Sequence, residues 1–146
     1  MTTEALLVVV PTAAEGFGID LAQTPQEGAD LPEFGTVRWH TLISADRTPS
    51  EELTLGVAIF GPGDTLPPHR HGPAEFYFGL DGSGTATVDG VAHPLGPGRA
   101  VFIPCNAEHG VVAGPEGLRM AYGFARASFA EVDYHFSPPV DPASQG

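Results

Sequence analysis

The chain of 146 residues has no lysine, and its six basic side chains are all arginines, against 18 acidic ones. With a net charge of -12 it offers no cluster of positive charge, and binding to nucleic acid or to an anionic membrane surface requires one. The missing lysine also excludes Schiff-base chemistry and a lysine general base. We therefore expect neither a nucleic-acid partner nor a membrane partner.

Cysteine is almost absent as well. The single cysteine, Cys105, excludes a disulfide within the chain and favours a reducing compartment. No apolar run approaches the roughly 20 residues that a membrane span needs. Glu4 stands where a secretory signal would carry positive charge. These absences predict a cytoplasmic protein.

Glycine and proline, by contrast, are abundant, with 19 and 15 residues, while the apolar fraction of 42% argues against disorder. Short apolar runs separated by such turn residues predict an all-β domain. The expected strands are 5–10, Val37–Ser44, Leu53–Phe60, Glu75–Leu80, Gly84–Val88, Val91–Leu95, Ala100–Ile103, Gly110–Ala113, Leu118–Ala125 and Glu131–Phe136. The only helix expected in the second half is the short segment Ala127–Ala130.

This pattern predicts one domain in three parts. Residues 1–36 form an N-terminal strand and arm that packs on the barrel, residues 37–136 form the barrel, and residues 137–146 form a flexible tail. In Glu75–Leu80, Phe76 and Phe78 alternate with Glu75 and Tyr77, so both faces of that strand require cover. A homodimer would supply it, with Val8–Val10 and neighbouring strand faces as candidate contacts.

The most informative group consists of three histidines and one glutamate. His69 and His71 are two residues apart and so share one face of a strand, Glu75 follows, and His109 lies downstream. Three neutral imidazoles and a carboxylate form a first shell for one divalent transition metal per chain, and Ni, Mn, Fe, Zn and Co all remain open. The site would keep a net charge near +1 and attract a small carboxylate-bearing metabolite.

Several side chains are candidates for the same cavity. Tyr77 shares its face with Glu75, and a phenol beside a dication loses its proton more easily, which makes Tyr77 a candidate general base. Tyr122 and Tyr134 could reach the cavity from the last strands, Trp39 could pack there, and Arg38 could clamp a carboxylate. Ordinary packing of the histidines and tyrosines in a core is the alternative reading.

The glycines and prolines around the ligands resemble the two motifs of the cupin superfamily. The first is Gly63-x5-His69-x-His71-x3-Glu75-x6-Gly82, and the second is Gly98-x5-Pro104-x-Asn106-x2-His109. Asn106 replaces a glycine of the family pattern, and it tolerates the left-handed backbone that glycine would supply. Ala113 replaces the usual final Asn. This resemblance implies a single-domain cupin-type β-barrel, a double-stranded β-helix or jelly roll, with an N-terminal arm.

Further stretches resemble the dimethylsulfoniopropionate (DMSP) lyases among the small cupins. They are Val37-Arg38-Trp39, the run from His69 to Tyr77, Asn106-Ala107-Glu108-His109, and Phe129 to Tyr134. The likeness implies a metal-dependent carbon–sulfur lyase that forms dimethyl sulfide and acrylate, with Tyr77 as the base and Tyr134 in support.

The substrate's sulfonium group would need aromatic faces. Trp39, Phe60, Phe102, Tyr122 and Phe124 are available for it. Since cupins host many activities, an Fe(II)-dependent dioxygenase and a non-catalytic small-molecule-binding protein remain alternatives.

Overall fold

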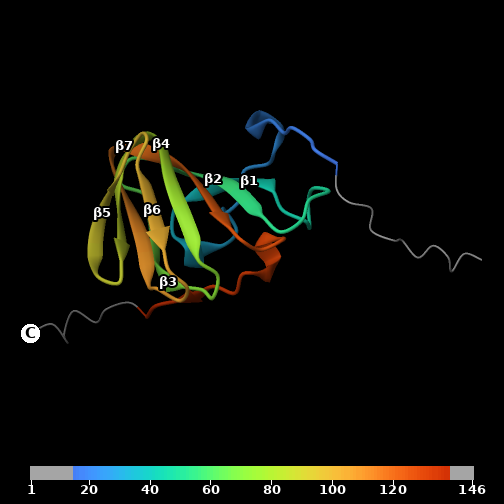
Figure 1. The fold of residues 1–146 in the computed structure, drawn as a ribbon. Coiled ribbons are helices and arrows are strands. Elements are labelled where there is room, and N and C mark those ends of the chain that lie inside the picture. The colour runs from blue at the N-terminus through green and yellow to red at the C-terminus, as the bar shows by residue number, and fades with distance from the viewer. Residues whose placement is uncertain (1–14, 139–146) are drawn as a thin grey trace, which may run out of the picture.

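The structure, a computed structural model, describes residues 15–138. In the described part, strands dominate and the helical segments are three short 3-10 turns (Figure 1). In chain order the elements are η2 (Leu21–Gln23), η3 (Pro32–Phe34), β1 (Arg38–Ile43), β2 (Thr54–Phe60), β3 (Thr65–Arg70), β4 (Glu75–Val88), β5 (Val91–Leu95), β6 (Ala100–Ile103), β7 (His109–Phe124), η4 (Phe129–Glu131) and β8 (His135–Phe136). The predicted all-β class is confirmed. The predicted strand 5–10, the contacts at Val8–Val10 and most of the tail lie outside the described residues.

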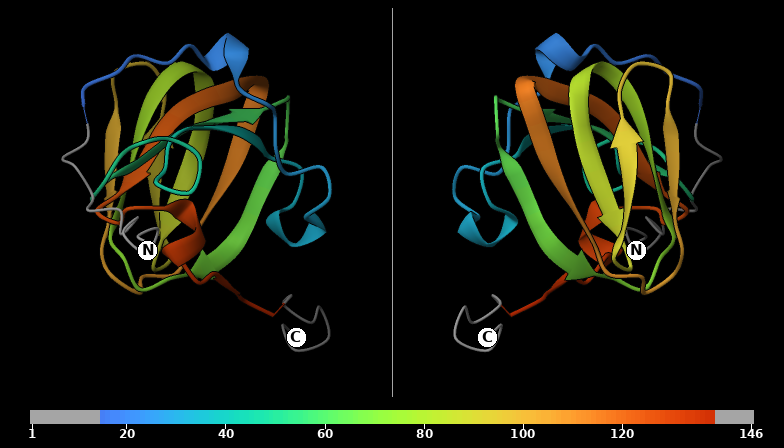
Figure 2. Two further views of the ribbon diagram at one scale, coloured as in Figure 1. Left: turned by 90° about the vertical axis from the view of Figure 1, so that its right-hand side faces the viewer. Right: turned by 90° about the vertical axis from the view of Figure 1, so that its left-hand side faces the viewer.

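Two long strands, β4 and β7, organise the sheet, because they pair antiparallel along most of their length. The first part of β4 also pairs with β6, and its second part pairs with β5. In the same way β7 pairs with β3 through its first half and with β2 through its second half. The strands therefore run β1-β2-β7-β4-β6 on one side and β8-β3-β7-β4-β5 on the other. This arrangement is consistent with a jelly roll, and the strands curve around a common interior (Figure 2).

β4 was expected as two strands, Glu75–Leu80 and Gly84–Val88, and the glycines between them explain the difference. The register with β7 shifts between Gly79 and Asp81 and again between Gly82 and Gly84. Gly82 has a φ of 76°, and a Cβ there would lie 2.8 Å from the carbonyl carbon of Gly117 and closer still to its oxygen. The strand bends at these glycines without ending, so it passes from one side of the barrel to the other. β7 likewise joins two strands that were expected separately, Gly110–Ala113 and Leu118–Ala125.

β3 was not expected as a strand, because it contains Pro67 and Pro68. A proline has no backbone N–H to donate to a neighbouring strand. The pairing with β7 shifts register between Leu66 and His69, where the prolines lie. The irregular stretch is therefore tolerated, and pairing resumes at His69.

The C-terminal segment was expected as one strand, Glu131–Phe136, and most of that prediction is wrong. Phe129–Glu131 forms a 3-10 turn after Ser128, whose backbone N–H donates to Glu131 Oε2 at 3.2 Å. Only His135 and Phe136 are in a strand, paired with β3. The irregular stretch between the turn and β8 carries Tyr134, which packs against the hydrophobic core.

At the other end of the chain, the arm lies against the barrel. Glu27 forms a bridge with Trp39, and Leu31 and Phe34 pack against the core. In the second of the two sequence motifs, Asn106 adopts a φ of 62°. This left-handed backbone confirms the reason given for the Asn in a glycine position.

Candidate metal centre

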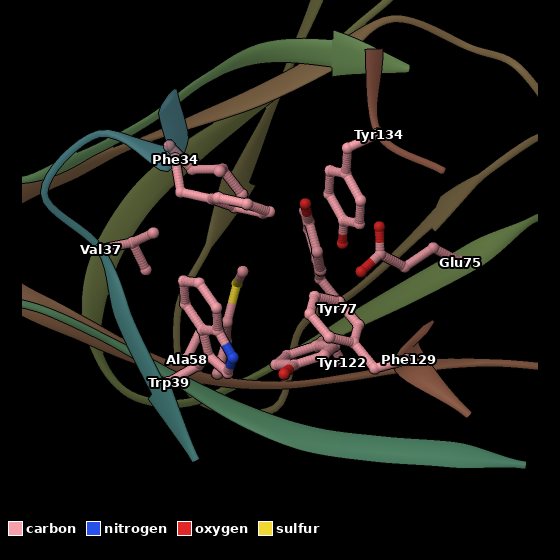
Figure 3. Close-up of a pocket in the computed structure, with 11 residues that line it drawn as sticks. Phe34, Val37, Trp39, Ala58, Glu75, Tyr77, Tyr122, Phe129 and Tyr134 are labelled. Atoms are coloured by element: carbon pink, nitrogen blue, oxygen red, sulfur yellow. The ribbon is translucent and has the colours of Figure 1, made fainter. Parts of the chain in front are cut away.

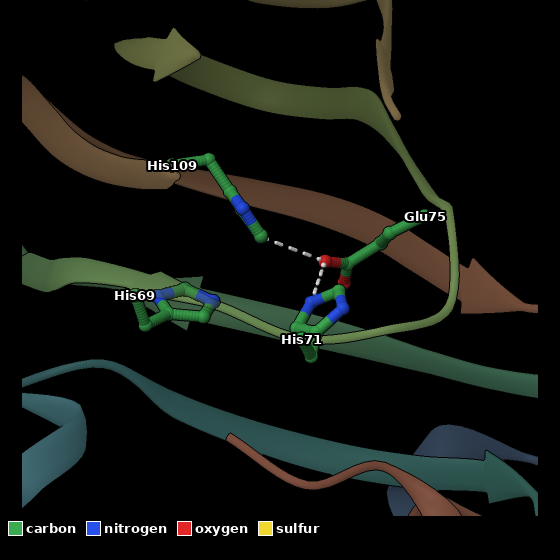
Figure 4. Close-up of side chains that lie close together, drawn as sticks. All are labelled: His69, His71, Glu75 and His109. Carbon is green, nitrogen blue, oxygen red and sulfur yellow. Dashed lines mark hydrogen bonds and ion pairs between the residues drawn. The ribbon is translucent and has the colours of Figure 1, made fainter. Parts of the chain in front are cut away.

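The four predicted ligands converge in the interior (Figure 4). His69 lies near the end of β3, His71 just after it, Glu75 begins β4 and His109 begins β7. His69 and His109 are directly paired across β3 and β7. One ligand atom from each of the four residues lies within 4.8 Å of every other, and all four side chains are buried.

Each of the three imidazoles is oriented by a backbone carbonyl two residues away in sequence. The Nδ1 atoms lie 2.8 Å from Pro67 O for His69, 2.9 Å from Pro73 O for His71 and 2.9 Å from Ala107 O for His109. A carbonyl accepts only, so each Nδ1 must carry the proton and each Nε2 presents a lone pair to the interior. This tautomer is the one that a histidine uses to bind a metal through Nε2.

The inward Nε2 atoms have no good partner other than a cation. Those of His71 and His109 each lie 3.1 Å from the same oxygen, Glu75 Oε1, and two lone-pair acceptors do not attract each other. Within residues 15–138 the buried Nε2 of His69 has no hydrogen-bond partner. A divalent metal between these atoms would satisfy all of them. The residues therefore fit the metal that the motif implies.

The pKa shifts of His69 and Glu75 in the metal-free site also fit a metal site. Burial, with His109 nearby, lowers the pKa of His69 to about 4, so His69 is neutral at pH 7. Burial alone would raise the pKa of Glu75, but the imidazoles of His109 and His71 beside the carboxylate outweigh burial and leave that pKa lowered. A neutral imidazole and an ionised carboxylate are the forms that bind a metal.

A pocket beside the metal site is lined by all three predicted catalytic tyrosines. Glu75, Tyr77, Tyr122 and Tyr134 line it together with Trp39 (Figure 3). The hydroxyl of Tyr77 and Nε1 of Trp39 are buried without a hydrogen-bond partner in the described part of the chain. These two unpaired donors, on residues that line the pocket, are available to a ligand.

All three tyrosines are protonated in the absence of a metal. Burial raises the pKa of Tyr77, Tyr122 and Tyr134, and the negative charge of Glu75 raises each one further. A dication bound by Glu75 would remove the second cause. The ease with which Tyr77 loses its proton therefore depends on the metal site.

Tyr122 also connects the pocket to the N-terminal arm. Thr41 lies close enough to the phenol to oppose the rise in the pKa of Tyr122, and the Thr41 hydroxyl donates to Glu27 Oε2 at 2.7 Å. Arg47 donates to both carboxylate oxygens of Glu27, at 2.9 and 2.8 Å. A polar chain from Thr41 through Glu27 to Arg47 thus runs from beside Tyr122 to the protein surface.

Three of the four predicted substrate-binding residues, Arg38, Phe102 and Phe124, do not line the pocket, which corrects the sequence interpretation. Phe102 is 70% exposed and points outward from β6. The guanidinium of Arg38 donates to the carbonyls of Thr36 and Val37, at 3.2 and 2.9 Å, because it alternates with the inward Trp39 along β1. Phe124 is buried, but it lies against His71 with ring centroids 5.2 Å apart and supports a ligand.

Six pocket-lining residues were missed from the sequence, and Phe34, Met120 and Phe129 among them show why. Phe34 comes from the arm, in a stretch whose sequence pattern predicts no regular structure. Phe129 begins the stretch Phe129 to Tyr134 that carried the resemblance, so that stretch was the available signal. Met120 lies on β7 two residues before Tyr122 and therefore shares its face.

The fold and the buried ligand group together define a cupin with a group able to hold a metal. Residues 56–121 match the Cupin domain family. The chain is 54% identical to the dimethylsulfoniopropionate lyase DddW of Ruegeria pomeroyi over 119 residues, which cover 82% of this chain and 78% of that protein. The chain therefore belongs to the DMSP-lyase-like cupins.

Solved structures support the same fold. The polyketide cyclase RemF from Streptomyces resistomycificus superimposes with a TM-score of 0.71 at 21% identity, over 87% of this chain and 89% of that one. A chain from the crystal structures of the DMSP lyases RdDddP and RnDddQII gives a TM-score of 0.67 at 19% identity, over 79% of this chain and 63% of that one. At such identities the likeness concerns the fold alone.

Proposed function

We propose that this protein is a metal-dependent lyase that converts DMSP into dimethyl sulfide and acrylate. The observation that carries the proposal is the placing of Tyr77 in one pocket with the metal ligand Glu75, in a chain 54% identical to a DMSP lyase. The identity indicates the substrate, and the pocket supplies the groups that its elimination requires.

In the proposed reaction His69, His71, Glu75 and His109 would hold a divalent metal, which would supply a Lewis acid for the substrate carboxylate and for the negative charge that develops there. Tyr77, as the phenolate, takes the proton from the carbon next to that carboxylate. The C–H electron pair forms the new double bond, the C–S bond breaks, and sulfur leaves with the bonding pair. Tyr122 and Tyr134 line the same space, where they orient the substrate and exclude water.

The experiment compares wild-type protein with Tyr77→Phe, both loaded with the same metal. Wild type should release dimethyl sulfide and acrylate in equal amounts from DMSP. Tyr77→Phe should lower kcat by at least about 100-fold, the low end of the range for a general base, and should retain one metal ion per chain. Failure of metal-loaded wild type to release either product would sink the proposal.

Oxygen uptake separates this reaction from the dioxygenase alternative. Elimination needs no oxidant, so the rate of dimethyl sulfide release should be the same in anaerobic and aerated buffer. Substrate-dependent oxygen consumption would favour an Fe(II) dioxygenase. The identity of the divalent metal, whether Ni, Mn, Fe, Zn or Co, is to be found by elemental analysis of the protein as isolated and by reloading with each ion.

We also propose that the protein acts as a homodimer. Phe76 and Phe78 of β4 are 43% and 40% exposed, and Phe102 on the adjoining β6 is exposed more fully. These three side chains form an outer aromatic face without charge, and a second copy of the same face would cover it. Light scattering should give twice the chain mass, and Phe102→Asp should give the monomer mass.

The place of action is proposed from composition. The exposed lone Cys105 suits a reducing cytoplasm. Within the described residues, no helix is long and apolar enough to cross a membrane. Fractionation of expressing cells, with the activity assayed in each fraction, tests the cytoplasmic location.

A further inference from the structure

One ion pair joins the N-terminal arm to the loop between β1 and β2. Arg47, on that loop, donates to both carboxylate oxygens of Glu27 in the arm, at 2.9 and 2.8 Å. Thr41 on β1 donates to the same carboxylate at 2.7 Å. The side chains of Arg47 and Glu27 are 42% and 20% exposed, so the pair lies at the protein surface. We call this ion pair the clasp.

On its arm side, the clasp holds a cover over Trp39. The backbone N–H groups of Glu27 and Trp39 donate to each other's carbonyls, at 2.8 and 3.1 Å. The next residue, Gly28, lies against the indole, because a Cβ built on it would be 2.7 Å from Cζ3 of Trp39. Trp39 lines the pocket and is only 4% exposed. The arm therefore helps to separate this end of the pocket from solvent.

On its other side, the loop that carries Arg47 is bound to the C-terminal segment. The Ala45 N–H donates to the carbonyl of Ala127 at 2.7 Å. The Phe129 N–H donates to Oγ of the buried Ser44 at 2.9 Å, and Ser44 in turn donates to Asp46. Phe129 begins η4 and lines the pocket. The two segments that flank the barrel at this end of the pocket are thus both attached to one loop.

The clasp is the charged part of this connection. Among residues 15–138 it is the only ion pair that the arm makes. A bidentate pair of arginine and carboxylate fixes the relative orientation of its two segments. A partly exposed pair nevertheless contributes modestly to stability and is screened by salt. Such a link can bias a local opening of the structure without preventing it.

We propose that Glu27 and Arg47 are positioning residues, whose ion pair holds the arm and the C-terminal segment together over the end of the pocket and so controls the access of small molecules to it. Neither residue lines the pocket. Their effect passes through the segments that they join. The inference concerns access to the pocket and does not depend on the reaction proposed above.

The test uses the fluorescence of Trp39, the only tryptophan of the chain. Quenching by acrylamide, a small neutral molecule, is measured on the full chain loaded with zinc, whose filled d shell does not itself quench fluorescence. Arg47→Met and Glu27→Gln each remove one charge. Each should raise the quenching constant about two- to fivefold, the increase in an open population that loss of one partly exposed ion pair allows. Constants equal to that of wild type would overturn the proposal.

Arg119→Met is the matched control. Arg119 pairs with Asp81 at 2.9 Å, its side chain is 44% exposed, and neither residue lines the pocket. Because this substitution removes an equivalent charge elsewhere, the quenching constant should stay at the wild-type value. An increase as large as that in Arg47→Met would assign the effect to loss of positive charge in general and would contradict the clasp.

Salt provides a readout that simple loss of packing would not change. In wild type, about 1 M sodium chloride, at which the Debye length is about 3 Å, should raise the quenching constant because it screens the ion pair. Arg47→Met has no pair to screen, so its constant should not respond. The same response to salt in both proteins would contradict the proposal.

A reversed pair separates charge from shape. Glu27→Arg and Arg47→Glu each place two like charges together, and each should be quenched more strongly than the neutral variants. Combined in one chain, they should return the quenching constant toward that of wild type. A double variant quenched as strongly as the single ones would show that charge pairing does not hold the segments. Because quenching requires no substrate, failure of the proposed lyase reaction would leave each of these results unchanged.

Discussion

The hydroxyl end of Tyr122 lies directly over Gly56, the residue paired with it on β2. A Cβ built on Gly56 would lie 2.7 Å from Cε1 of Tyr122 and nearer still to the hydroxyl oxygen. The registers put Tyr77, Tyr122, Gly56 and Thr41 in one row across β4, β7, β2 and β1. Because Gly56 has no side chain, the phenol of Tyr122 extends across β2 to Thr41 on the next strand.

Gly56→Ala should therefore displace Tyr122 and break its contact with Thr41. We expect a fall in kcat for DMSP on the order of tenfold or more, because small displacements of positioning groups are costly, and a stability loss of about 1–3 kcal/mol from overpacking. Steady-state kinetics and urea unfolding measure the two effects. Gly96→Ala is the control, since its Cβ would come no closer than 3.6 Å to the atoms that flank it. Equal kcat values in the two variants would contradict the role given to Tyr122.

A substitution of Thr41, the residue at the other end of this row, provides a second test. Thr41→Val removes the hydroxyl that donates to Glu27 and that lies near the Tyr122 phenol. Leaving these groups unpaired should cost about 1–3 kcal/mol of stability, and kcat should fall severalfold. Thr41→Ser keeps the hydroxyl and should restore kcat. If the serine and valine variants were equally impaired, shape at position 41 would matter and the hydrogen bonds would not.

The metal group could be predicted from the sequence because its spacing is tied to strand geometry. Alternation puts His69 and His71 on one face, and the cupin motif adds Glu75 and His109, so no knowledge of the packing was required. The aromatic lining of the pocket could be predicted from the sequence only in part. Phe34 lies in an irregular arm, and its position depends on contacts with Trp39 and Tyr134 that no local pattern encodes.

The errors have the same origin. Phe102 was expected to face the pocket because it is large and apolar. Side chains alternate along β6, however, and Phe102 points outward between Val101 and Ile103, which are buried. β3 was missed because Pro67 and Pro68 oppose strand formation, a local preference that pairing with β7 overrides. Composition identifies apolar residues, but the register decides which of them face the pocket.

Acid should destabilise the metal-free protein. The pKa of His69 falls from 6.5 unfolded to about 4 folded, so between these values the unfolded state binds more protons and stability falls as the pH falls. The full loss for this one residue, reached only below pH 4, is about 3 kcal/mol. The lowered pKa of Glu75 adds a loss in the same direction as the pH falls below the usual value of 4.5. Urea unfolding in EDTA at pH 7 and pH 4.5 measures the greater part of the His69 loss.

His69→Gln should flatten that pH dependence, whereas His93→Gln, on β5 away from the ligand group, should leave it as in wild type. A wild-type protein equally stable at both pH values would show that His69 is not held neutral in the folded state.

Metal binding itself should depend on the individual ligands. Wild-type protein should bind one divalent ion per chain, and His69→Ala or His109→Ala should reduce this to well under a tenth at the same free metal concentration, because each removes one inward Nε2 from a buried four-ligand set. Elemental analysis after dialysis measures the content. His40→Ala is a demanding control: His40 is also buried, but it bonds to Thr24 in the arm and lies outside the ligand group. If His40→Ala lost its metal as completely as His109→Ala, a general loosening of the barrel would explain both losses. That result would contradict the assignment of the four residues as the metal ligands.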